Sequence, residues 1–270
     1  MIAMITIHID PTIFTLGPLK ATWYGLMIAL AILGGAIGTA RLAKAQGISP
    51  DDVYTIALWA VPGGMVGARL FHVIDQWQYY ILRPVEIFYI NQGGLAIYGA
   101  IMGGTLVGII AAKVMRISVS RLADAAAPAL ILAMAVGRVG NIINGEHHSF
   151  PTDLPWGVIY THPNSFGISQ YPTHPVVAYE ILWDLLAFGI LWWARRRLPA
   201  HGMLFLLYGS LYSSGRFFLS FLRFDAIILL GLRQAQILAI LTLLICLPWM
   251  IYLGMRSVPR PKVKAKTRAR

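Results

Sequence analysis

Seven apolar stretches of about 20 residues constrain this chain more than any other feature of its sequence. A helix needs about 20 apolar residues to cross the core of a bilayer, and stretches of that length recur along the whole chain, at 23–42, 53–74, 95–115, 122–143, 176–194, 203–222 and 235–253. Only 12% of the residues are charged, about half the share of an ordinary soluble domain. The sequence therefore predicts an all-α, polytopic integral membrane protein with seven transmembrane helices.

Basic residues gather in alternate loops and in the C-terminal tail. Three loops carry two, three and three of them and the tail carries seven, which makes fifteen of the 22 in the chain. Because Lys and Arg favour the cytoplasmic side, we expect a cytoplasmic C-terminus and, seven spans away, an N-terminus outside. We expect one transmembrane catalytic domain over 1–255, with an outer-side loop at 144–173, and a basic cytoplasmic tail over 256–270. The aromatic segment 75–94 is expected to lie in the outer interface as a short helix.

Several classes of site are excluded by what the sequence lacks. Its single cysteine, Cys246, lies in an apolar run, so there is no disulfide framework and no cysteine metal site. His147 and His148 are adjacent rather than spaced as metal ligands, and the chain has no phosphate-binding loop and no serine nucleophile elbow. We expect no metal, no cofactor and no nucleic-acid partner. Residues 1–20 also lack the pattern of a cleavable signal peptide.

An arginine in the fourth apolar stretch is the first candidate for a functional residue. Arg138 stands in V-G-R-V-G-N-I-I-N-G-E, and the spacing of three to Asn141 and then to Asn144 puts these side chains near one helical face. An arginine near the membrane centre costs roughly 2.5–3.5 kcal/mol on insertion scales, so it needs a partner or an anion. Arginines at span ends often reach back to the interface, but Asn141, Asn144 and Glu146 favour a polar cavity.

A second group of arginines lies in the sixth stretch, in G-R-F-F-L-S-F-L-R. Arg216, Ser220 and Arg223 share one helical face, where two cations repel unless an anion lies between them or carboxylates pair them. Arg223 is close enough to the span end to reach the interface, whereas Arg216 lies about two turns deeper. Glu180, about one turn inside the fifth stretch, could counter Arg138 or Arg216, hold a headgroup hydroxyl, or act as a base.

Three further residues complete the set of candidates. Tyr98 lies between glycines in G-G-L-A-I-Y-G-A near the start of the third stretch, Tyr24 lies at the start of the first, and Arg69 lies three residues before His72 in the second. Each could equally belong to an aromatic belt or to helix packing. Together, the arginines, asparagines, tyrosines and glutamates form an inventory that is typical of phosphate recognition.

In this order along the chain, the motifs resemble those of the bacterial prolipoprotein diacylglyceryl transferases. The resemblance covers nearly the whole chain and rests on I-D-P-T-I-F-T-L-G-P-L-K-A-T-W-Y-G-L, G-A-R-L, G-G-L-A-I-Y-G, G-R-V-G-N-I-I-N-G-E, H-P-V-V-A-Y-E and G-R-F-x-x-x-F-L-R. It implies transfer of the diacylglyceryl group of phosphatidylglycerol to the lipobox cysteine thiol of a preprolipoprotein, which forms a thioether and releases glycerol phosphate. It also implies a multi-pass protein of the bacterial inner (plasma) membrane with its active site toward the outer leaflet.

Together with the residues above, the resemblance implies a set of roles. Ser220 stands where the family commonly has a glutamate. Some members carry a histidine, assigned as the base, where this chain has Tyr98, so the proton acceptor is either this phenol or another group such as the leaving phosphate. An anion or lipid transporter that uses intramembrane arginines is the alternative; it predicts broken helices or repeated halves, and no repeat is visible. The expected catalytic residues are Arg138, Arg216 and Tyr98, and those expected to bind phosphatidylglycerol are Arg138, Asn141, Asn144, Glu146, Glu180, Arg216, Arg223, Tyr24 and Arg69.

Overall fold

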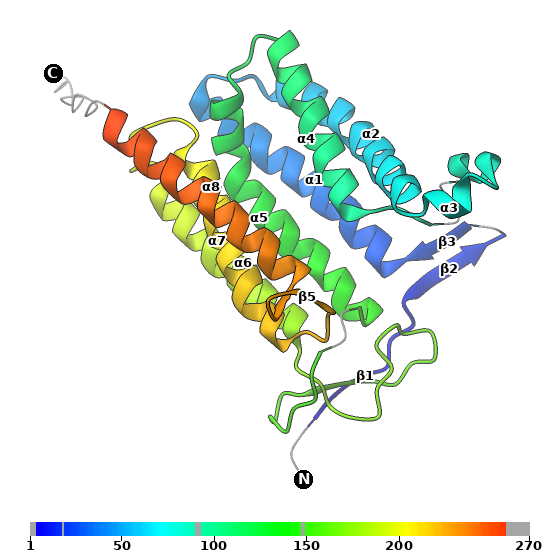
Figure 1. Cartoon of the computed structure of the whole chain (residues 1–270). Helices are drawn as coiled ribbons and strands as arrows, with labels where there is room; N and C mark the ends of the chain where they lie inside the picture. The colour runs from blue at the N-terminus through cyan, green and yellow to red at the C-terminus, as the bar shows by residue number, and fades with distance from the viewer. Residues whose placement is uncertain (1–3, 18, 90–92, 147–148, 258–270) are drawn as a thin grey trace, which may run out of the picture. The chain divides into compact units, whose positions relative to one another are not determined.

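The computed structural model describes residues 4–17, 19–89, 93–146 and 149–257, and most of them lie in helices (Figure 1). His147, His148 and the tail from residue 258 onward lie outside the described residues. The α-helices of the described part are α1 (Trp23–Ala43), α2 (Pro50–Asp75), α3 (Trp77–Tyr80), α4 (Ile97–Val114), α5 (Val119–Asn144), α6 (Val176–Ala194), α7 (Met203–Leu219) and α8 (Gln234–Arg256).

Each of the seven apolar stretches overlaps one of these helices. The remaining helix, α3, lies between the second and the third stretch. Six of the helices described are long and apolar enough to cross a membrane. The exception is α7, which has 17 residues and is followed directly by a 3-10 helix over Ser220–Leu222. A mostly helical, multi-pass membrane protein is therefore confirmed, and the count of seven spans stays a prediction.

The chain divides into two compact units, and the division falls inside α1 and α5. One unit consists of Met1–Gly35 and Ala127–Arg270, and the other of Ala36–Ala126. In the second unit, α2 and α4 pack through glycines on both helices. A Cβ at Gly67 would lie 2.4 Å from the carbonyl oxygen of Gly99, and one at Gly103 would lie 2.5 Å from that of Gly63. Only glycine permits this backbone approach, which is a common way for membrane helices to pack.

The segment between α2 and α4 forms two short helical turns rather than the single helix predicted. One is α3, and the other is a 3-10 helix over Pro84–Phe88. The segment returns to the end of α2, where the backbone N–H of Ala96 donates to the carbonyl of Ala68 at 3.1 Å. The tyrosines and glycines of this segment are thereby brought next to the last turns of α2.

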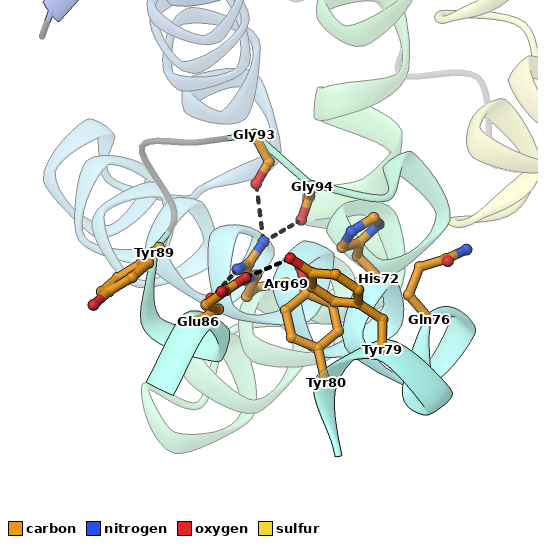
Figure 2. A pocket seen from close by; sticks show the side chains of 9 residues that line it. All are labelled: Arg69, His72, Gln76, Tyr79, Tyr80, Glu86, Tyr89, Gly93 and Gly94. Carbon is orange, nitrogen blue, oxygen red and sulfur yellow. Dashed lines mark hydrogen bonds between the residues drawn. The ribbon is translucent and has the colours of Figure 1, made fainter. Parts of the chain in front are cut away.

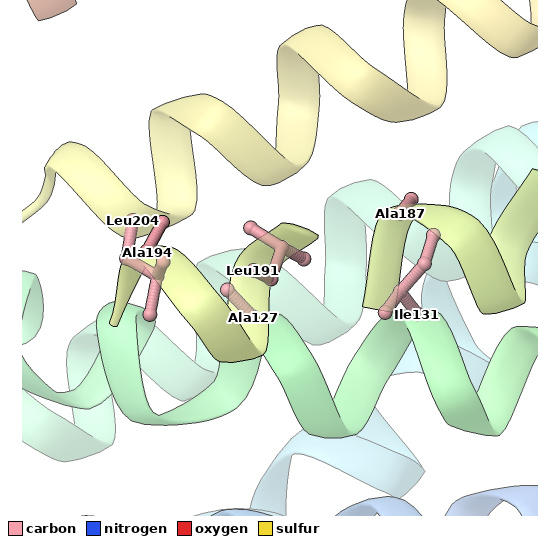
Figure 3. Packing of buried hydrophobic residues seen from close by; sticks show 6 residues of the cluster. All are labelled: Ala127, Ile131, Ala187, Leu191, Ala194 and Leu204. Carbon is pink, nitrogen blue, oxygen red and sulfur yellow. The ribbon is translucent and has the colours of Figure 1, made fainter. Parts of the chain in front are cut away.

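In the first unit, α7 lies against α6 and α8 (Figure 1), and α5, α6 and α7 share a buried apolar core. Small and branched side chains alternate in this core, so that the helices approach closely. Asp184 and Arg138 lie three and seven residues from core positions on their helices, which places them on the faces that pack inward. The core consists of Ala127, Ile131, Ala187, Leu191, Ala194 and Leu204 (Figure 3).

Three two-stranded sheets, all in the first unit, were not predicted from the sequence. β1 (Ile5–Ile7) pairs in parallel with β4 (Val158–Tyr160), so the N-terminal segment is tied to the region expected to be an outer-side loop. Within that region, the N–H of Thr173 donates to the carbonyl of Val158 at 3.0 Å. The other two sheets are hairpins next to α1 and α8, namely β2 (Thr12–Leu16) with β3 (Leu19–Thr22) and β5 (Ile227–Leu229) with β6 (Leu232–Arg233).

Candidate functional site

Glu180 of α6 is the residue around which Arg138, Arg216 and Arg223 gather. Its side chain is only 2% exposed. Its Oε2 accepts a hydrogen bond from Arg138 Nη1 of α5, and its Oε1 accepts one from Arg216 Nη1 of α7. Arg223 Nη1, beyond the end of α7, lies 3.9 Å from the same Oε1. One buried carboxylate therefore joins three helical segments through three guanidinium groups.

Asp184, one turn after Glu180, is a second carboxylate of this cluster and was not predicted from the sequence. Its side chain is buried, and its Oδ2 accepts a hydrogen bond from Arg138 Nε at 2.7 Å. The available signal was an acidic residue four positions after Glu180 in an apolar span, because that spacing puts both side chains on one helical face. Two carboxylates held through two different nitrogens fix the plane of the Arg138 guanidinium.

The formal charges of these four residues cancel, because the carboxylates of Glu180 and Asp184 form ion pairs with Arg138 and Arg216. The sequence left open whether a bound anion or carboxylate partners relieve the repulsion between Arg216 and Arg223. In the structure, carboxylates pair both arginines. Arg223 is also buried and paired, with its Nε 2.7 Å from Asp225 Oδ2, so it does not reach out to the interface.

Arg216 is the arginine of this cluster with the most hydrogen-bonding capacity left. A guanidinium carries five N–H donors, and among the described residues only Glu180 accepts from Arg216, through Nη1. The Arg216 side chain is 22% exposed, against 13% for Arg138. Among the described residues, Nε and Nη2 of Arg216 therefore have no hydrogen-bond acceptor, which leaves this edge as a donor for an anion.

The pocket between these helices is small, with a volume of about 10 Å³, which is close to the least that holds one water molecule. Trp183 takes up much of the space, because a Cβ at Gly215 would lie 2.2 Å from its Cδ1. The indole N–H of Trp183 donates to the carbonyl of Leu211 at 2.8 Å, which holds the ring in place. The space between these helices is therefore too small for a ligand group larger than water.

Asn141 and Asn144 hydrogen-bond to Glu146 rather than to the arginine cluster. Asn141 Nδ2 donates to Glu146 Oε2 at 2.6 Å, and Asn144 Nδ2 donates to Oε1. The chain turns back over the end of α5 at Gly145, whose φ of 70° suits a glycine after the end of a helix. This turn brings Glu146 over the two asparagines. The predicted polar face of α5 therefore divides into Arg138, which faces Glu180 and Asp184, and the two asparagines, which hold Glu146 over the helix end.

Tyr160 lies beside this helix end, with its Cδ1 3.1 Å from where a Cβ on Gly145 would be. Burial raises the pKa of Tyr160 to about 12, so the phenol is neutral at physiological pH and is not suited to act as a base. Tyr24, in the first turn of α1, packs against α5, since a Cβ at Gly140 would lie 2.9 Å from its Cα.

Arg69 and Tyr98 belong to the second unit. Tyr98 lies in the first turn of α4 and is 37% exposed. Arg69 is buried and donates four hydrogen bonds to backbone carbonyls (Figure 2). Whether either residue acts together with the arginine cluster stays a prediction. The carbonyls that accept from Arg69 are those of Glu86 at 2.5 Å, Ile87 at 2.8 Å, Gly93 at 2.9 Å and Gly94 at 3.0 Å.

Comparison with known proteins gives matches over nearly the whole chain. A family model described as prolipoprotein diacylglyceryl transferase matches residues 11–252, a range that includes every candidate site residue. A protein of Synechococcus elongatus named phosphatidylglycerol–prolipoprotein diacylglyceryl transferase is 40% identical, over 96% of this chain and 94% of its own length. Proteins of the same name from Clostridioides difficile and Staphylococcus aureus are 38% and 37% identical, over 86% and 93% of this chain and 90% and 92% of their own lengths.

Proposed function

Because the chain belongs to the prolipoprotein diacylglyceryl transferase family, we propose that it transfers the diacylglyceryl group of phosphatidylglycerol to the lipobox cysteine of bacterial preprolipoproteins. The cysteine sulfur forms a bond to the glycerol carbon of the lipid, and the bond from that carbon to the phosphate oxygen breaks. The products are a thioether-linked lipid and glycerol phosphate. The observation that carries this proposal is a buried arginine–carboxylate cluster that leaves one edge of Arg216 free.

The proposed setting is the inner (plasma) membrane, with the reaction at the outer leaflet. The domain of residues 1–255 would cross the bilayer seven times, with α7 as the shortest span, the N-terminus outside and the basic tail, 256–270, in the cytoplasm. The distribution of Lys and Arg among the loops supports this orientation. Phosphatidylglycerol and the lipobox segment would then meet where the arginines of α5 and α7 are expected to lie.

In the proposed reaction, Arg216 binds the phosphate of the donor lipid through Nε and Nη2. Arg138, held by Glu180 and Asp184, adds a fixed positive potential close by. As the carbon–oxygen bond breaks, negative charge grows on the leaving phosphate. Donors that are already oriented in a site of low dielectric stabilise such charge strongly, and this is usually the largest contribution to catalysis.

Glu180 has the role of holding the two arginines at the same place rather than acting as a base. Both of its carboxylate oxygens accept from guanidinium groups, and protonation of Glu180 would remove the charge that both arginines share, which disfavours it as the base. We further propose that Asn141, Asn144, Glu146, Tyr24 and Arg223 contribute to binding the lipid headgroup, and that Arg69 contributes indirectly, by holding the segment that precedes Tyr98.

The nucleophile arrives with the second substrate. A cysteine thiol has a pKa of about 8.5 and is mostly protonated at neutral pH, so its proton has to be accepted as the sulfur attacks. Tyr98 is the proposed partner of that thiol, as a hydrogen-bonding group or as the base, and the leaving phosphate is the alternative acceptor. Cys246 has no role in this scheme.

The test is transfer by the purified full chain in detergent, with phosphatidylglycerol and a lipobox peptide. Mass spectrometry should record a peptide heavier by one diacylglyceryl group, together with released glycerol phosphate. A peptide with serine in place of the lipobox cysteine, and phosphatidylethanolamine in place of the donor, are the matched controls. The proposal fails if the folded protein gives no product, or if Arg138→Ala and Arg216→Ala both keep full transfer. An anion or lipid transporter would move its substrate without any covalent product.

A further inference from the structure

A cavity of about 360 Å³ in the second unit contains none of the groups that contact the phosphate or the thiol in the transfer proposed above (Figure 2). It is bounded by the last turns of α2, by α3 and by the turn before α4. Its volume lies in the range of ligand sites, roughly 300–1,000 Å³, whereas the pocket in the arginine cluster has room for about one water molecule.

The walls of this cavity are held by Arg69. Its guanidinium joins the carbonyls of the 3-10 turn, Glu86 and Ile87, to those of Gly93 and Gly94. The turn at Gly94 has a φ of 72°, and a Cβ there would lie 2.6 Å from both Arg69 Nη1 and His72 Nε2. Glycine at this position and a buried arginine behind it indicate a shaped cavity rather than a gap between loops.

The charged residues that line the cavity, Arg69 and Glu86, carry opposite formal charges, and the protein itself occupies most of their hydrogen-bonding groups. Arg69 donates to four carbonyls, and the Glu86 carboxylate accepts from Tyr79 Oη at 2.6 Å and lies 3.7 Å from Arg83 Nη1. Among the described lining residues, there is therefore no uncommitted cation for a phosphate and no uncommitted carboxylate for an ammonium group. The electrostatics favour a neutral ligand.

The remaining lining groups are neutral donors and acceptors set among aromatic rings. Tyr80 packs edge-on against His72 and Tyr79, with ring centroids 5.9 and 5.2 Å apart. Within the described part of the chain, neither the His72 ring nor the Tyr80 hydroxyl has a hydrogen-bond partner, and Gln76 keeps its amide oxygen free. A ligand hydroxyl both donates and accepts, and its carbon skeleton packs on aromatic rings, so these walls suit a compact polyol.

We propose that this cavity binds the neutral, hydroxyl-rich headgroup of a membrane lipid, of glycerol to monosaccharide size. The lipid is favoured over a soluble polyol because the segment that forms the cavity exposes large apolar side chains next to it, which is typical of a segment lying in a membrane interface. These exposed side chains are Trp77, Ile81, Leu82, Val85 and Phe88.

The proposal is independent of the proposed transfer. The donor site depends on a phosphate and on Arg216, whereas the cavity depends on hydroxyl groups and needs no phosphate. A neutral glycolipid should therefore bind the cavity while it leaves the donor site empty, and it should bind equally to an Arg216→Ala variant.

The experiment measures binding of monoglucosyldiacylglycerol to the full chain by native mass spectrometry from detergent, with phosphatidylethanolamine of the same chain length as the comparison lipid. We expect one glucolipid to bind more tightly than phosphatidylethanolamine. Tyr80→Phe, which removes one hydroxyl and keeps the ring, should weaken glucolipid binding about 5-fold. Tyr54 is an exposed tyrosine at the other end of α2. The matched control, Tyr54→Phe, should leave glucolipid binding unchanged.

A second arm uses free methyl glucoside and glycerol as probes. Saturable binding of a free polyol that Tyr80→Phe weakens, without any preference for the glucolipid, would keep the hydroxyl chemistry and assign the source to a soluble polyol. The proposal is overturned if the glucolipid binds no better than phosphatidylethanolamine and no polyol binds. It is equally overturned if Tyr80→Phe, shown to be folded by an unchanged melting temperature, binds as the unmodified chain does.

Discussion

Arg69 in the second unit and the pair Arg138–Arg216 in the first unit are buried in different ways. Arg69 donates four hydrogen bonds to backbone carbonyls, which are neutral and belong to a single segment of the chain. Arg138 and Arg216 donate to carboxylates of α6, which carry charge and belong to a different helix. The first arrangement shapes a local turn, and the second joins three helices around a neutral cluster.

Burial alone therefore does not distinguish an arginine that is available to a ligand from one that holds the backbone. Arg69 is as buried as a site residue should be, but four of its five N–H donors are taken by the backbone. Arg216 is less buried and donates through one nitrogen only. The number of N–H donors left on the guanidinium distinguishes the two residues.

The largest expected effect is on stability, from Glu180→Ala. This change leaves Arg138 and Arg216 buried without their shared carboxylate, and breaking a buried ion pair in this way costs about 3–5 kcal/mol. The melting temperature in detergent should fall steeply. Glu86→Ala in the second unit is the matched control: it removes a partly exposed ion pair and the hydrogen bond from Tyr79, worth together about 2 kcal/mol at most. Equal losses for the two variants would contradict the distinction between the sites.

Arg216→Ala should act on catalysis more than on folding. If the open edge of Arg216 stabilises the leaving phosphate, kcat for transfer to a lipobox peptide should fall about 100- to 1,000-fold, as when one donor to a developing anion is removed. Arg69→Ala should lower the yield of folded protein instead, with much of the activity kept per folded molecule. A comparison of specific activities, corrected for the folded fraction, tests this. The assignment breaks if Arg69→Ala loses turnover and Arg216→Ala keeps it.

Arg69→Lys should show that geometry rather than charge is needed at the second site. A lysine carries three N–H donors on one atom, so it cannot reach the four carbonyls that the guanidinium joins. Loss of about two such bonds should cost about 2 kcal/mol, measured as a lower melting temperature and as faster hydrogen exchange over residues 84–89. Unchanged exchange in that turn would mean that Arg69 does not organise it.

The helical bundle could be predicted from the sequence because its signal is repeated over about 20 residues at a time. The short strands could not: β1 and β4 have three residues each, and their pairing joins parts of the chain some 150 residues apart. The arginines and Glu180 stood out because charge is rare in these stretches. Asp184 was missed, although it has the same rarity, because no motif pointed to it.

The partners of each side chain could not be read from periodicity. The spacing of Arg138, Asn141 and Asn144 puts them near one side of α5. Their positions along the helix differ by one turn or more, and that difference decides whether a side chain contacts α6 or Glu146. That choice depends on the packing of Trp183 over Gly215 and on the reversal at Gly145, both of which are tertiary features.

Asp184→Asn tests the part of the cluster that the sequence did not suggest. The amide keeps an oxygen that can accept from Arg138 Nε but removes the charge. We expect kcat to fall about 10-fold, with KM little changed, because Arg138 would be held less firmly while Arg216 keeps its open edge. Asp184→Glu should restore part of the loss. A change confined to the melting temperature, with kcat unaffected, would reduce Asp184 to a purely structural role.

The smallest expected effect is that of Tyr98→Phe, and it asks whether the unit that contains Arg69 contributes a group to the chemistry at all. An ordinary phenol has a pKa of about 10, so it is a poor base at neutral pH. Tyr98 is also more exposed than Arg138 and Arg216. If it only hydrogen-bonds the phosphate or the thiol, Tyr98→Phe should lower kcat less than 10-fold and leave the pH profile unchanged. The leaving phosphate would then be the proton acceptor, and the chemistry would depend on Arg138 and Arg216. A loss of 1,000-fold or more, together with a shifted pH profile, would instead make Tyr98 the base and would assign catalytic groups to both units.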